Sequence, residues 1–160
     1  KSTSEAIFTD NPEDIFKFMI KKEEETIELV KIDTIWRISG NDTLEVKSHL
    51  INDLFNNVLK VNKVDILSAN REKYGTYSVD DSTGTHLIMI NSKGETIEKY
   101  VFGRSGMGYY YSNVRMGNDP NVYLADQNVI HMLSTRDSYW GEKPKDEILP
   151  PIPADSTIIN

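Results

Sequence analysis

The sequence predicts an α+β domain built from two related units, each an antiparallel β-meander followed by a helix packed on one face of the sheet. Glu-Thr-Ile-Glu occurs at residues 25–28 and again at residues 95–98, and a Met-Ile pair precedes each copy at the same distance. Each copy closes a run of alternating apolar residues and is followed by an aromatic strand and a helix-like segment. This repetition indicates a duplicated supersecondary unit, with units at about 14–68 and 84–140.

The first unit begins with three short strands. Residues 15–20 are apolar at almost every position, residues 26–32 alternate with Ile27, Leu29 and Ile32 directed inward, and residues 35–38 form a third strand. Three strands in succession predict an antiparallel meander.

A helix follows this meander. Asp42 and Glu45 have the spacing of a capping box. The apolar positions behind them recur every three or four residues and form one stripe, which we expect to cover the sheet. The stripe consists of Val46, Leu50, Ile51, Leu54, Phe55, Val58 and Leu59.

The second unit repeats this order with one extra strand. After short elements at 64–67 and 69–73, strands at 87–90 and 96–102 flank the turn at 91–94. Residues 109–111 are predicted to form the next strand and residues 122–124 the last. Asp126 is placed to cap a second helix with an apolar face made by Val129, Ile130, Met132 and Leu133.

The ends of the chain differ from this domain. Residues 1–12 are mostly small and polar, which predicts a disordered segment before a single domain at 13–142. Residues 143–160 combine four prolines with charged residues, which predicts an extended or disordered tail. The chain starts at Lys1, so we expect a protein trimmed of a signal or anchor, or a mature or tag-cleaved product.

Composition limits the possible functions. With 160 residues the chain fits one domain with a sizeable core, and without Cys it has neither disulfides nor thiolate metal sites. The net charge of −7 works against binding to phosphate backbones, so we expect no nucleic acid. No apolar run approaches the roughly 20 residues of a membrane helix.

The sequence offers few candidates for chemistry. His49, His86 and His131 are far apart in the chain and lack metal-site spacing, so we expect no metal and no cofactor. The segments 80–84 and 103–108 resemble calcium and phosphate loops only superficially and are interpreted as turns. A carboxylate pair for glycoside hydrolysis stays open, because 25 acidic residues always permit one.

The candidate binding surface consists of Arg104, Tyr109 and Tyr111. On a strand, Tyr109 and Tyr111 share one face while Tyr110 takes the other. With Arg104 beside them, the two rings form an aromatic and cationic surface that can stack a sugar or hold a peptide, although one face of this strand is expected to be core. Exposed sheet edges, which can accept an added strand, are a second possible binding mode.

A family resemblance rests on the order and spacing of residues 25–30, 35–38, 46–55, 73–75, 102–103, 109–111, 122–124 and 136–140. This order resembles that of a bacterial family known only as a domain of unknown function, DUF4340. The resemblance implies an extracytoplasmic, membrane-anchored protein associated with ABC transporters of the gliding-motility type, and it carries no catalytic residue.

We therefore expect a non-catalytic, periplasmic or otherwise extracytoplasmic binding or scaffolding domain. Its expected partner is a protein of the cell envelope, with ABC transporter subunits as candidates, and its contact with the membrane is expected only through an anchor absent from this chain. The alternatives are a glycan-directed hydrolase that uses a carboxylate pair and a purely structural spacer.

Overall fold

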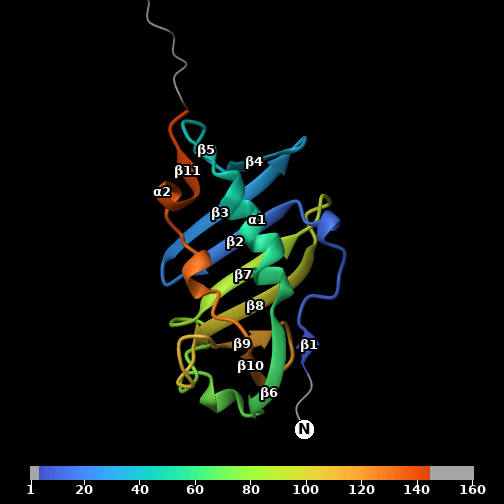
Figure 1. The fold of residues 1–160 in the computed structure, drawn as a ribbon, viewed down its shortest axis with the longest axis vertical. Helices are drawn as coiled ribbons and strands as arrows, with labels where there is room; N and C mark the ends of the chain where they lie inside the picture. The colour runs from blue at the N-terminus through green and yellow to red at the C-terminus, as the bar shows by residue number, and fades with distance from the viewer. Residues whose placement is uncertain (1–3, 145–160) are drawn as a thin grey trace, which may run out of the picture.

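The computed structural model describes residues 4–144, which form a mixed α+β fold dominated by one antiparallel sheet (Figure 1). The nine strands of this sheet lie in the order β1-β6-β10-β9-β8-β7-β2-β3-β4, and β5 and β11 form a separate pair. The strands are β1 (Glu5–Ala6), β2 (Lys17–Lys22), β3 (Glu25–Ile32), β4 (Ile35–Ile38), β5 (Glu45–Val46), β6 (Asn62–Ser68), β7 (Thr85–Ile90), β8 (Thr96–Arg104), β9 (Ser112–Met116), β10 (Val122–Ala125) and β11 (Gly141–Glu142).

Two meanders make up most of the large sheet. Strands β2 to β4 form one and β7 to β10 the other, and they meet where β2 pairs antiparallel with β7, with Ile20 opposite Leu87. Strand β6 does not stay with the first meander but pairs with β10 at the far side of the second. The helical elements are α1 (Ser48–Asn56), α2 (Asp137–Trp140) and the 3₁₀ turns η1 (Pro12–Asp14), η2 (Val58–Lys60), η3 (Arg71–Lys73) and η4 (Ile130–Met132).

Helix α1 covers one face of the sheet, as the apolar stripe predicts (Figure 1). Ile51 and Leu54 are buried, and the Phe55 ring packs edge-on against Phe18 of β2. The predicted capping box is not used, because Glu45 belongs to β5 and pairs with Glu142 of β11. The helix therefore begins only at Ser48.

The predicted repeat of two meander-and-helix units is not confirmed. Ile20 is buried and Met19 is only partly buried, whereas Met89 is buried and Ile90 is partly buried. The two Met-Ile pairs thus present opposite residues to the core, and a bulge follows Met89 in the pairing of β7 with β8. The second meander is followed by the three-residue turn η4 and the single turn α2 instead of a counterpart of α1.

The prediction of disorder at the N-terminus is wrong for residues 4–12. Strand β1 pairs with β6, and Ile7 and Phe8 are only 6% and 8% exposed. Tyr100 donates a buried hydrogen bond of 3.1 Å to the Ile7 carbonyl. Burial of these two apolar side chains outweighs the polar composition around them. Residues 1–3 and most of the predicted tail, residues 145–160, lie outside the described residues.

Ile32 is also predicted incorrectly. It is 52% exposed, because it is three positions from Leu29 and five from Ile27 on β3, so strand alternation directs it to the opposite face of the sheet. Its cross-strand partner Ile35 is 55% exposed. The tip of the β3–β4 hairpin therefore presents apolar side chains to solvent.

Candidate functional site

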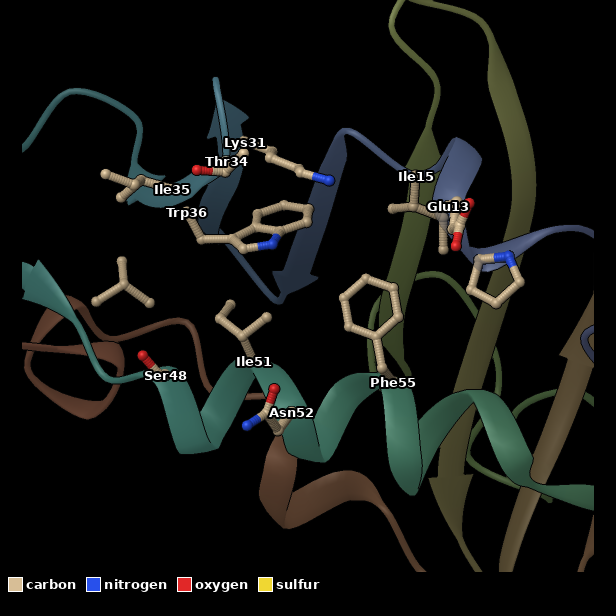
Figure 2. A pocket seen from close by; sticks show the side chains of 12 residues that line it. Glu13, Ile15, Lys31, Thr34, Ile35, Trp36, Ser48, Ile51, Asn52 and Phe55 are labelled. Carbon is tan, nitrogen blue, oxygen red and sulfur yellow. The ribbon is translucent and has the colours of Figure 1, made fainter.

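The largest cavity described is a groove of about 420 Å³ between the β3–β4 hairpin and α1. We call it the Trp36 groove. Figure 2 shows the Trp36 and Phe55 rings directed into the same space, with Ile51 rising from the helix between them. The lining residues are Pro12, Glu13, Ile15, Lys31, Thr34, Ile35, Trp36, Val46, Ser48, Ile51, Asn52 and Phe55.

Two aromatic rings, those of Trp36 and Phe55, line this groove, and the Phe18 ring packs against both of them from below. The ring centroid of Phe18 lies 5.4 Å from that of Trp36 and 5.4 Å from that of Phe55, and the Trp36 and Phe55 centroids are 6.1 Å apart. Phe18 is fully buried, while Trp36 and Phe55 are partly exposed. The inner ring holds the outer two in place, so the groove is preformed.

The rim of the groove is polar. Figure 2 shows the Lys31 side chain extending over the cavity from β3, and its Nζ atom lies 5.3 Å from the Phe16 ring centroid. No ion pair involving Lys31 occurs within residues 4–144. Glu13 is the single carboxylate among the lining residues. An apolar floor with scattered polar groups at the mouth suits an apolar side chain or an amphipathic ligand.

Strand β4 is the last strand of the large sheet, so its outer edge is paired with no other strand among the described residues. This edge borders the groove, beside β5. The Ser39 amide donates to the Glu28 carbonyl, whereas the Lys31 amide donates to Phe16 on the opposite side of β3. Because bonded residues alternate along an antiparallel pair, Arg37 bonds to β3 and Trp36 directs its N–H and C=O outward.

A second cavity of about 250 Å³ adjoins the outer side of β4. It shares Ile35, Trp36 and Val46 with the Trp36 groove. Open backbone groups and two side-chain cavities therefore meet at one residue, Trp36. The sequence identifies Trp36 and Phe55 only as apolar positions of a strand and a helix, so sequence reasoning missed this site.

The structure does not bring the predicted binding residues Arg104, Tyr109 and Tyr111 together in one cleft. Residues 109–111 form a turn, not a strand, because the chain reverses at Gly108 with φ 126° and β9 begins only at Ser112. Tyr109 is 90% exposed and lies beside Tyr110, which is 82% exposed, in a cleft of about 320 Å³. Arg104 is exposed at the end of β8, Tyr111 is partly buried, and neither lines this cleft.

One carboxyl group is perturbed by its surroundings. Burial, a hydrogen bond with Asp10 and the charge of Asp10 together raise the pKa of Glu98 to about 7. Burial also raises the pKa of Tyr100, two residues along the same strand. Neither Asp10 nor Glu98 lines any of the four cavities described.

Two of the remaining sequence candidates, His86 and the turn at 80–84, make hydrogen bonds within the fold. His86 is buried, with Nε2 3.0 Å from the Asp81 carbonyl oxygen. Hydrogen bonds from Thr83 and Ser82 lower the pKa of Asp80 and close the turn at 80–84. Within residues 4–144, no three His, Asp or Glu side chains come close enough to hold a metal ion.

Comparison with known proteins finds no matching family model, no similar curated protein and no similar solved structure. None of the helices in the described part of the chain is long and apolar enough to cross a membrane. The resemblance to the DUF4340 family, with the location and partners it implies, stays a prediction.

Proposed function

We propose that this chain is a binding module that takes an extended segment of a protein partner along β4, with one apolar side chain in the Trp36 groove. The observation that carries the proposal is the position of Trp36. Its backbone groups face outward from the last strand of the sheet, and its ring lines the Trp36 groove.

An extended peptide satisfies both features at once. Added next to β4, it would bond to the open N–H and C=O of Trp36, as strands do in β-augmentation. Since side chains of a strand alternate, every second side chain of the peptide would point to the face that carries α1. That face contains the groove, whose apolar floor would give specificity for a large apolar side chain.

The binding class is favoured over the two alternatives by particular features. A glycan hydrolase of the expected kind needs two carboxylates facing one substrate, whereas the groove contains Glu13 alone and the Asp10–Glu98 pair lies away from the cavities described. A spacer has no need of a preformed groove beside an open strand edge. Both observations support a binding role.

The proposed location of the domain and the proposed class of its partner rest on the sequence resemblance alone. We place the domain outside the cytoplasmic membrane, tethered by an anchor in the full-length protein. Its partner is proposed to be a protein of the cell envelope, including subunits of an ABC transporter.

A peptide library displayed on phage tests the proposal. Asn52→Trp would fill the mouth of the groove, because Asn52 is exposed on α1 and lines the cavity (Figure 2). His49→Trp is the matched control, since His49 is exposed on the same helix and lies outside the lining.

Peptides selected on the wild type should share one large apolar residue within an extended segment. We expect them to bind the wild type and His49→Trp equally and Asn52→Trp at least about tenfold more weakly. Alternate amides of the peptide should face β4. N-methylation of an amide that faces β4 should abolish binding, whereas N-methylation of an amide that faces away should leave it intact. The proposal would be contradicted if Asn52→Trp and His49→Trp bound the peptides equally, or if methylation at every peptide position had the same effect.

A further inference from the structure

We infer that the chain has a second binding site, for a neutral saccharide, in the cleft formed by Tyr109, Tyr110, Asp126, Gln127, Asn128 and His131. We call it the Tyr109 cleft. It shares no lining residue with the Trp36 groove and lies at the ends of β9 and β10 rather than at β4. The inference therefore does not depend on the proposed function.

The fold brings the two sides of this cleft together from separate segments. Strands β9 and β10 are antiparallel, with Ser112 opposite Ala125, so the loop entering β9 meets the segment leaving β10. The Ser112 hydroxyl donates a hydrogen bond of 2.7 Å to the Gln127 carbonyl and ties the two segments. The tyrosines come from the first segment and the polar side chains from the second.

The two tyrosine rings are far more exposed than packing requires. Tyr109 and Tyr110 are 90% and 82% exposed, and no hydrogen bond involves their hydroxyl groups within residues 4–144. Large aromatic surface left in water is typical of a binding surface. A ring face can cover the C–H face of a pyranose while the hydroxyl group remains free to bond.

The opposite side supplies donors and acceptors that are available to a ligand. The Gln127 side chain and the His131 ring have no hydrogen-bond partner among the described residues, and the Asn128 amide nitrogen has none either, because only its oxygen is used, by Ile130. Asp126 is held by two bonds from Asn62 that orient its carboxylate. Amides and an imidazole can both donate to and accept from the hydroxyl groups of a sugar.

The charge of the cleft selects among polar ligands. It contains no Lys or Arg and one carboxylate, Asp126, so it is unsuited to phosphate groups and therefore to nucleotides. Its lining has no aliphatic side chain that would anchor a peptide through apolar contacts. A cavity of about 320 Å³ is near the lower limit for small-ligand sites. A neutral sugar fits this combination of stacking faces and planar polar groups.

Titration of the ¹⁵N-labelled protein with four neutral trisaccharides, namely chitotriose, cellotriose, maltotriose and mannotriose, tests the inference. At least one should cause saturable amide shifts confined to residues 105–111 and 126–131. Adenosine monophosphate serves as the anionic comparison and should cause none there.

Variants then identify the contacts. Tyr109→Ala and Tyr110→Ala should each weaken binding of the responding trisaccharide by about tenfold, a loss typical of a stacked ring. Gln127→Leu should weaken it as well, through lost hydrogen bonds. Met107→Ala is the control and should bind like the wild type, because Met107 is 63% exposed in the same loop and lies outside the cleft.

Three results would overturn the inference. The first is that none of the four trisaccharides shifts these residues. The second is that binding persists unchanged in the Tyr109→Ala and Tyr110→Ala variants. The third is a response to adenosine monophosphate alone. Peptide binding at the Trp36 groove is unaffected by each of these results, so the two sites can fail separately.

Discussion

At the scale of single residues, the surroundings of Glu98 connect its protonation to folding. It lies on β8 and contacts Asp10, in the segment between β1 and β2. Tyr100, two residues further on, donates to the Ile7 carbonyl in the same segment. When Glu98 loses its proton, its negative charge therefore lies beside the carboxyl group of Asp10.

The pKa of Glu98 predicts a pH dependence of stability. Because its folded pKa of about 7 is above its ordinary value of 4.5, the folded state binds more protons between these values. The stabilisation is complete below pH 4.5 and is lost as the pH rises through 7. Glu98→Gln imitates the neutral carboxyl group and should remove this loss.

Urea unfolding at pH 5 and pH 8 measures the effect. Relative to Glu98→Gln, the wild type should lose about 1 kcal/mol of unfolding free energy over this range, a value reduced for the partial exposure of the carboxyl group. Glu24→Gln, at an exposed position in the β2–β3 turn, should behave like the wild type. A wild type that gains stability from pH 5 to pH 8 relative to Glu98→Gln would refute this role.

Glycine is required at position 103 for a steric reason. Gly103 lies on β8 beneath the loop that contains Ser78, and a Cβ atom there would overlap the Ser78 carbonyl group. Both partners are backbone atoms in packed structure, so neither can move freely. Gly103→Ala should therefore lower the unfolding free energy by about 2 kcal/mol.

Gly106→Ala provides the comparison in the same region. A Cβ at Gly106 would meet no atom within 4 Å, and its φ is not in the left-handed region. Its urea midpoint should stay close to that of the wild type. Equal effects of the two substitutions would show that the contact with Ser78 is absent in solution.

At the scale of elements, the open edge of β4 predicts a difference in amide exchange. The Trp36 N–H faces outward, whereas the Arg37 N–H bonds to β3. By hydrogen exchange followed with NMR, the Trp36 amide should exchange at least about tenfold faster than that of Arg37. A bound peptide should slow exchange at Trp36 selectively. Similar protection of both amides without a ligand would mean that the edge is already covered.

The elements that sequence could predict are those specified by neighbouring residues. The hairpin of β7 and β8 follows from alternation around the turn at 91–94, and α1 follows from its apolar stripe. Strand β1 and the pair of β5 with β11 were missed, because two-residue strands have no periodicity and their partners are distant in the chain. Gly108 turns the chain where Tyr109 to Tyr111 predict a strand.

The same distinction applies to the candidate sites. Tyr109 could be proposed from the sequence, because a run of tyrosines is unusual in itself. Its neighbours in the cleft come from residues 126–131, and only the antiparallel register of β9 with β10 brings them near. The Trp36 groove likewise depends on how α1 crosses the β3–β4 hairpin, which no local pattern specifies.

At the scale of the whole molecule, the two predicted units are interleaved rather than side by side. Strand β6 comes from the first half of the sequence, yet it pairs with β1 and β10. The whole second meander separates it from β2, β3 and β4 (Figure 1). Without the second half, the first half therefore lacks a continuous sheet. Without the first half, the second meander loses its neighbours β6 and β2.

This arrangement predicts that neither half folds alone. Fragments 4–70 and 74–144, produced separately, should each lack a cooperative urea transition, because each would expose strand edges and apolar faces that the other covers. Mixed in equal amounts, they should regain the far-UV circular dichroism of the intact chain. The intact protein should unfold in one transition that coincides by Trp fluorescence and circular dichroism. A cooperative transition in either isolated fragment would instead favour two units that fold independently of each other.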